Sequence, residues 1–190
     1  MPLDAIPDLI LKFGFIDDFT VFGFILVSVK DELDKFKKFR DRMDNLSEKE
    51  SRAVGALVGL SIGDALGTTL EFEIDAPDEP HDKIIGGGKF RLKKGEWTDD
   101  TSQALCLGHS LLENDLDLED QMNKFSDWMM FGYMSSNGKC FDIGFGTSKA
   151  ITKYRNTKIA ISDDLNSAGN GSIMRLASVP IYCKEEGIVT

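Results

Sequence analysis

Two adjacent aspartates with a threonine on either side, Thr98-Asp99-Asp100-Thr101, have residue types and spacing suited to chemistry. An apolar helical pattern follows through Ala104 and Leu111, so the segment is predicted at a loop-to-helix junction. Threonine favours the capping position of a helix, and aspartate favours its first turn. Alternatively, adjacent carboxylates and a hydroxyl offer Mg²⁺, Mn²⁺ or Ca²⁺ several oxygen ligands at once. Spacing alone favours the capping role and leaves the metal role open.

Two glycine-rich loops each lead into a helical or apolar run. The first is Asp142-Ile-Gly-Phe-Gly-Thr147, with a helix predicted from about Ser148, and the second is Ser167-Ala-Gly-Asn-Gly-Ser172. Such loops present unpaired backbone N–H groups to an anion. Neither loop is a Walker motif or a dinucleotide fingerprint, so each taken alone is also compatible with a simple turn.

The element before the aspartates is a helix predicted from Ala53 to about Leu66. Ser47 and Glu50 have the spacing of a capping box at its start. An interior glycine costs ~1 kcal/mol against alanine, so repeated glycines need a reason such as close helix packing or a substrate cleft. We expect packing at the first two glycines of the stripe and a cleft at the last two, which flank Asp64 and lead to Glu71. The stripe is Gly55, Gly59, Gly63 and Gly67.

The first 46 residues are predicted to form a helical hairpin, which makes residues 1–46 and 47–190 the expected domains. Pro7 should open the first helix, and a second helix should run on through Met43. The most apolar stretch, residues 21–29, is far shorter than the ~20 residues that span a bilayer. No certain membrane contact is expected, although a peripheral contact by residues 10–29 stays open.

Composition excludes some partners. The 190 residues carry 22 basic and 32 acidic side chains, a formal charge of −10. This charge argues against nucleic-acid binding, which needs a positive face. Three cysteines without a C-x-x-C spacing are typical of reduced thiols, and a cytoplasmic location is expected.

Taken in order, these motifs resemble the ADP-ribosylglycohydrolase family, which includes the hydrolase that reactivates ADP-ribosylated dinitrogenase reductase. The resemblance covers about residues 50–183 and implies a compact all-α fold with two divalent cations, Mg²⁺ or Mn²⁺. It implies catalytic roles for Glu71, near the reacting sugar, and for Asp142, in contact with substrate or metal-bound water. It also implies metal ligation by Thr98, Asp99 and Asp100, and an ADP-ribose site at Gly144, Gly146, Thr147, Gly169, Asn170, Gly171 and Ser172.

Family members place a further Asp-x-Asp/Thr cluster of metal ligands beyond the Gly-Asn-Gly loop. No such cluster follows Arg175 in this sequence. The expectation is therefore the N-terminal half of the fold, with only part of the metal-ligand set. Separately, the run Pro2-Leu-Asp-Ala-Ile-Pro-Asp8, with Gly14 and Asp17-Asp18, resembles part of a YkvA-like domain, which implies a helical hairpin and nothing catalytic.

The function implied by the resemblance is metal-dependent hydrolysis of the glycosidic bond between ADP-ribose and an acceptor. The expected partner is an ADP-ribosylated protein or a small ADP-ribosyl compound. Two alternatives stay open. One is a non-catalytic module that binds ADP-ribose or another nucleotide, and the other is a membrane-associated helical protein with a vestigial hydrolase half.

Overall fold

The computed structural model describes residues 34–35, 37–73, 81–161 and 169–185. The chain divides into two units, Met1–Ser51 and Arg52–Thr190. In the first unit residues 37–44 are helical, as predicted for the second helix of the hairpin. The predicted first helix and most of the second lie outside the described residues. Within the described part of the chain, no helix is long and apolar enough to cross a bilayer.

Helix α2, Glu48–Gly67, begins directly after the predicted capping box. The Ser47 backbone N–H donates to the Glu50 carboxylate at 2.8 Å, and the Glu50 N–H donates to the Ser47 hydroxyl at 3.3 Å. The Ser47 hydroxyl also donates to the Glu50 carboxylate, at 2.6 Å, and this bond together with that from the Ser47 N–H holds the pKa of Glu50 below its usual value. The capping box is therefore confirmed, and it satisfies backbone donors that a helix start leaves without intrahelical partners.

The glycine stripe of α2 faces open space. A Cβ atom added at Gly55, Gly59, Gly63 or Gly67 would meet no atom within 4 Å. All four glycines are exposed, and Ala65 is the buried residue of this helix. The packing expected at Gly55 and Gly59 is therefore not met by any contact in the described part of the chain.

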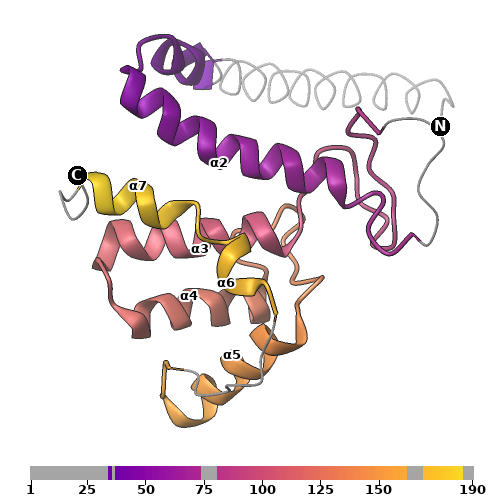
Figure 1. Ribbon diagram of the computed structural model, residues 1–190, viewed down its shortest axis with the longest axis vertical. Coiled ribbons are helices and arrows are strands. Elements are labelled where there is room, and N and C mark those ends of the chain that lie inside the picture. Colours follow the sequence, from indigo (N-terminus) through magenta and orange to yellow (C-terminus); the bar gives the residue numbers. More distant parts are fainter. Residues whose placement is uncertain (1–33, 36, 74–80, 162–168, 186–190) are drawn as a thin grey trace, which may run out of the picture. The chain divides into compact units, whose positions relative to one another are not determined.

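The second unit is built from helices, as the all-α prediction requires. After α2 come α3 Asp99–Asn114, α4 Leu118–Phe131, α5 Phe145–Thr157, α6 Gly171–Met174 and α7 Ser178–Glu185. Between α2 and α3, Gly87 and Leu92 form an isolated β-bridge. Helix α3 packs against α4, α6 and α7, and α5 packs against α4 (Figure 1). Helix α3 is thus the central element of this unit.

The core lies where α3 and α4 meet. Leu111 and Cys106 of α3 pack with Trp128 of α4 and Ile151 of α5, and all four are almost fully buried. Burying an aliphatic or aromatic side chain of this size stabilises the fold by ~1.5–3 kcal/mol. This packing therefore fixes the position of α3 and so of its N-terminal end.

Helix α7 approaches α3 closely at one glycine. A Cβ at Gly108 would lie 2.9 Å from the Ser178 hydroxyl oxygen. That hydroxyl donates to the Ala104 carbonyl, also at 2.9 Å. The small residue therefore lets a buried hydrogen bond join the two helices.

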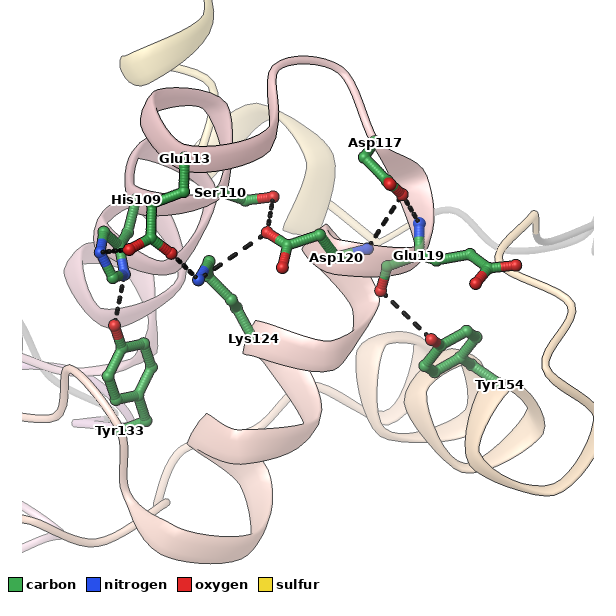
Figure 2. Close-up of polar contacts among 9 residues, drawn as sticks. All are labelled: His109, Ser110, Glu113, Asp117, Glu119, Asp120, Lys124, Tyr133 and Tyr154. Atoms are coloured by element: carbon green, nitrogen blue, oxygen red, sulfur yellow. Dashed lines mark hydrogen bonds and ion pairs between the residues drawn. The ribbon is translucent and has the colours of Figure 1, made fainter.

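Polar side chains also join α3 to α4, as Figure 2 shows. The Lys124 ammonium of α4 lies 2.7 Å from the Glu113 carboxylate of α3, whose other oxygen lies 3.1 Å from His109 Nε2. The Ser110 hydroxyl donates to the Asp120 carboxylate at 2.6 Å. The Lys124–Glu113 and Ser110–Asp120 pairs each join α4 to α3, so they fix the register of α4 along α3.

Helix α4 has a clear signal at each end. The Asp117 side chain accepts hydrogen bonds from the Glu119 and Asp120 N–H groups, which caps the first turn (Figure 2). Gly132 ends the helix with a left-handed backbone, φ 70°. The buried Tyr154 of α5 donates to the Asn123 side chain at 2.8 Å and so fastens α5 to α4.

Candidate functional site

Asp64, near the end of α2, holds the start of α3. The Thr98 N–H donates to both carboxylate oxygens of Asp64 at 3.0 Å, and the Thr98 hydroxyl donates to one of them at 2.8 Å. The N–H and hydroxyl of Thr101 donate to Asp64 at 3.1 and 2.7 Å. Hydrogen bonds to a charged acceptor are about twice as strong as neutral ones. A single carboxylate therefore fixes the turn that carries Asp99 and Asp100.

The two roles predicted for Thr98 and the aspartates can now be compared with the structure. Thr98 occupies the N-cap position of α3, but its side chain makes no capping hydrogen bond. It donates to Asp64 instead, so the prediction of a capping hydroxyl is wrong. Asp99 and Asp100 do lie in the first turn of α3.

Asp99 is buried, with 6% of its surface exposed, and Asp100 is half-buried. Burial, reinforced by the charges of Asp142, Asp100 and Asp64, raises the pKa of Asp99 to about 8. Burial, followed by the charges of Asp64 and Asp142, also raises the pKa of Asp100. Desolvation and like charges both disfavour ionisation of a carboxyl group. Burial and the neighbouring negative charges therefore disfavour the ionised form of both aspartates in this turn.

The Glu71 and Asp142 side chains are hydrogen-bonded to each other. Glu71 is exposed as a residue, yet partial desolvation of its carboxyl group and the charge of Asp142 raise its pKa to about 7. Burial likewise raises the pKa of Asp142. Two carboxyl groups in such contact share one proton. With its pKa raised to about 7, the Glu71 carboxyl group is suited to both give and accept a proton near neutral pH.

The backbone beside both carboxylates has an uncommon conformation. Asp142 itself has φ 54°, and Phe72, which follows Glu71, has φ 69°. Non-glycine residues rarely adopt this left-handed region, and such outliers cluster at functional sites.

The two glycine loops approach each other. A Cβ at Gly171 would lie 2.9 Å from the Thr147 hydroxyl oxygen, so a larger residue would have to displace the Thr147 side chain. Helix α5 begins at Phe145, earlier than the predicted Ser148, which places Gly144 at its N-cap position. The other residues predicted to bind substrate are exposed: Gly144, Gly146, Gly169, Asn170 and Ser172.

Gln103 is a site residue that the sequence analysis missed. Its amide N–H donates to the Asp99 carboxylate at 3.2 Å, and its carbonyl oxygen accepts from Arg175 at 2.6 Å. Gln103 is fully buried, and the Arg175 guanidinium lies 4.8 Å from the centre of the Phe125 ring. Because Arg175 occupies the amide oxygen, the amide nitrogen must point toward Asp99. No pattern distinguishes this glutamine from an ordinary helical residue, although Arg175 belongs to the Gly-Asn-Gly motif.

The donor chemistry of the site suits a hard divalent cation. Carboxylate and hydroxyl oxygens are the ligands of Mg²⁺ and Mn²⁺, and a cation would relieve the repulsion among the aspartates. Among the residues that the structure describes, however, no three His, Cys, Asp or Glu side chains are grouped so that they could hold a metal ion. The oxygen atoms of these side chains suit such an ion, but the described residues supply only part of a ligand set.

The all-α unit thus carries, in order along the chain, a helix with a glycine stripe, an acidic turn and two glycine loops. The sequence model of the ADP-ribosylglycohydrolase family matches residues 45–189, and this chain belongs to that family. The resemblance found from the motifs is thereby confirmed.

Two relatives are named for the same chemistry. ADP-ribosylarginine hydrolase Tri1 of Pseudomonas putida (strain GB-1) is 46% identical over 134 residues, which cover 69% of this chain and 36% of the relative. ADP-ribosyl-[dinitrogen reductase] glycohydrolase of Rhodospirillum rubrum is 39% identical over 132 residues, 65% of this chain and 42% of that one.

A solved structure described as an ADP-ribosylglycohydrolase-related protein complex aligns with a TM-score of 0.58 at 39% identity. The alignment covers 70% of this chain and 43% of that one. The chain thus spans about two fifths of the length of these relatives, which fits the predicted N-terminal half.

The YkvA-like resemblance is also found, as a short match. The uncharacterized membrane protein YkvA of Bacillus subtilis (strain 168) is 55% identical over 40 residues, 21% of this chain and 38% of that protein. The match is partial, as the sequence motif predicts.

Proposed function

We propose that this chain carries the N-terminal part of a hydrolase that cleaves the bond between ADP-ribose and a protein side chain. The carrying observation is the hydrogen-bonded pair of Glu71 and Asp142, together with the acidic turn at Asp99 and Asp100. Membership of the family supports the reaction class. An arginine acceptor is proposed because the Pseudomonas relative is named for ADP-ribosylarginine.

The proposed reaction breaks the bond between the anomeric carbon and the acceptor nitrogen, and that electron pair leaves with the nitrogen. The transition state is oxocarbenium-like, so nearby carboxylates stabilise it. Water supplies the oxygen of the new C–O bond. The proton that water loses passes to the Glu71–Asp142 pair and then to the departing guanidine nitrogen, which balances the reaction.

Thr98, Asp99 and Asp100 would supply ligands to divalent cations, Mg²⁺ or Mn²⁺. When bound, such ions orient ribose hydroxyls and water and offset the negative charge of the pyrophosphate. Asp64 fixes the turn that bears these ligands. Because the described residues offer only part of a ligand set, we propose that Mn²⁺ binds weakly and takes much of its coordination from water.

The ADP-ribose moiety would bind at the two glycine loops. Backbone N–H groups of Gly146 and Thr147, in the first turn of α5, lack intrahelical acceptors and suit a pyrophosphate oxygen. Phe145, 86% exposed, begins the same helix and offers an aromatic face on which the adenine could stack. The cytoplasmic location belongs to this proposal, and the free thiols of Cys106, Cys140 and Cys183 support it.

The test is hydrolysis of ADP-ribosyl-agmatine by the chain, followed as release of ADP-ribose with Mg²⁺, with Mn²⁺ and with EDTA. Glu71→Gln and Asp142→Asn should each lower the rate at least tenfold, since each removes the shared proton. Glu73→Gln, an exposed change two residues from Glu71, is the matched control and should retain activity.

Two results would contradict parts of this proposal. ADP-ribose binding without hydrolysis in any metal would favour the alternative, a non-catalytic ADP-ribose-binding module. Tight Mn²⁺ binding in calorimetry that Asp100→Ala leaves unchanged would remove the acidic turn from the metal site.

A further inference from the structure

Two residues of an aromatic cluster are chain neighbours of the two candidate catalytic residues. Phe72 follows Glu71 in the chain, and Phe141 precedes Asp142. The Phe90 ring lies between them, with its centroid 5.9 Å from that of Phe72 and 5.4 Å from that of Phe141. These three rings, here called the phenylalanine cluster, therefore connect the neighbours of both carboxylates.

The phenylalanine cluster already holds a cation of the protein itself. The Lys89 ammonium lies 3.6 Å from the centre of the Phe72 ring and 5.6 Å from that of Phe90. A cation within ~6 Å of a ring centre is attracted by the negative ring face. The same ammonium charge acts on the carboxyl group of Asp142 and favours its ionised form. A cation at this position is therefore within electrostatic reach of the Asp142 carboxyl group.

The loop that carries Lys89 is held firmly against the end of α2. A Cβ at Gly88, φ 64°, would lie 2.8 Å from the Thr68 carbonyl oxygen, so only glycine permits this approach. The Thr69 hydroxyl donates to the Gly86 carbonyl at 3.2 Å. Phe72 itself is 56% exposed, so its ring can be reached from solvent. The cation position is thus built by the fold and accessible to a ligand.

We propose that the phenylalanine cluster is the binding site for the guanidinium group of an arginine-linked substrate, and that Lys89 occupies this site when substrate is absent. The assignment rests on the proposed hydrolase function. A guanidinium is planar and more weakly hydrated than an ammonium, and it stacks on aromatic faces. It therefore competes with Lys89 for Phe72, and it places the departing nitrogen beside Glu71 and Asp142. An acceptor linked through a serine oxygen carries no charge for this site to recognise.

The test compares N-ethylguanidinium with N-ethylurea, which has a similar shape and no charge, by amide NMR titration of the full chain. The guanidinium should shift the amides of Phe72, Phe90 and Asp142, and the urea should not. Lys89→Met removes the competing cation and should tighten guanidinium binding by about two- to fivefold. Lys94→Met, the same change at an exposed lysine of the neighbouring segment, is the control and should leave the affinity unchanged.

Phe72→Leu should abolish the guanidinium shifts, and Phe72→Tyr, which keeps the ring, should retain them. Equal binding of the urea, or guanidinium binding that survives Phe72→Leu, would overturn the assignment. ADP-ribose titrated into the same samples separates the two hypotheses. Wild-type protein that binds guanidinium but not ADP-ribose would contradict the proposed function and leave the guanidinium site standing.

Discussion

At the scale of single residues, the buried acidic turn depends on how Asp99 is held. Gln103 donates to its carboxylate, and Arg175 fixes the orientation of the Gln103 amide. The chain Arg175–Gln103–Asp99 links the segment after the second glycine loop to the first turn of α3. Because the Gln103 amide is neutral, it connects Arg175 to Asp99 without adding another negative charge beside the aspartates.

Gln103→Met keeps the side-chain volume but removes both hydrogen bonds, one of which comes from the charged Arg175 guanidinium. A hydrogen bond to a charged group contributes about 1.5–3 kcal/mol and a neutral one about 0.5–1.5 kcal/mol, so we expect a loss of about 2–4 kcal/mol in unfolding free energy. Urea denaturation measures this loss. Gln121→Met makes the same change on α4 and should cost less. Equal costs for the two variants would mean that Gln103 has no special role.

The raised pKa of Asp99 predicts how stability depends on pH. In the folded state the pKa is about 8, whereas an unfolded aspartate titrates near ~3.9. Between these values the folded protein binds more protons than the unfolded chain, so its unfolding free energy should fall as pH rises from about 4 to about 8. Denaturant titrations without metal should show this fall, and Asp99→Asn should reduce it. A stability that is independent of pH over this range would contradict the burial of an uncompensated carboxyl group.

At the scale of elements, the link between α2 and α3 depends on the Asp64 carboxylate. Four donors from Thr98 and Thr101 converge on its two oxygens. Asp64→Asn replaces one acceptor oxygen with an NH₂ group that faces donors. We expect a loss of about 3 kcal/mol in unfolding free energy, the effect of one or two hydrogen bonds to a charged group. Asp82→Asn, at an exposed aspartate, is the control, and equal stability of the two variants would argue against the link.

The open face of α2 gives a second element-scale prediction. Because a Cβ at Gly59 or Gly63 meets no atom within 4 Å, alanine at either position should raise stability by up to ~1 kcal/mol through helix propensity. Thermal unfolding of the two variants measures this gain. The glycine spacing predicts packing at Gly59 and a cleft at Gly63, and equal stabilisation by the two substitutions would show that division to be wrong. A loss of stability in Gly59→Ala alone would instead support packing at Gly59.

The sequence predicts structural features that depend on neighbouring residues, but not contacts between residues far apart in the chain. The capping box needs only Ser47 and Glu50, three residues apart, so its spacing predicted the start of α2. Asp64 lies 34 residues from Thr98, and nothing in either segment indicates the hydrogen bonds between them. Thr98 looked like a helix cap because its residue type and position were right. The competing acceptor on α2 decided the outcome.

The same reasoning explains what the family resemblance added. Glu71 and Asp142 are 71 residues apart, and no periodicity places them together. The resemblance named both as catalytic, and the structure hydrogen-bonds them to each other. Lys89 and the phenylalanine cluster were missed because only the three-dimensional arrangement of Phe72 and Phe90 reveals a cation position.

At the scale of the whole molecule, the buried hydrophobic core cluster belongs to one unit. Its members run from Cys106 in α3 to Ile151 in α5, and the partly buried side chains packed on them extend to Tyr182. All of these lie within the unit Arg52–Thr190. The stability of this unit should therefore be a property of residues 52–190 and not of the segment that resembles YkvA.

Deleting residues 1–46 tests this independence and keeps Ser47, so the α2 capping box survives. Because the core cluster is untouched, we expect the midpoint of cooperative thermal unfolding to change by less than about 4 °C, the shift that ~1 kcal/mol produces in a domain of this size. Several large apolar side chains of the unit are exposed, including Val58 and Ile62 of α2. If the first segment shields such surface, the shortened chain will self-associate, because large exposed apolar patches promote aggregation. Sedimentation of both forms at equal concentration distinguishes the outcomes, and aggregation of the shortened chain alone would contradict independent folding.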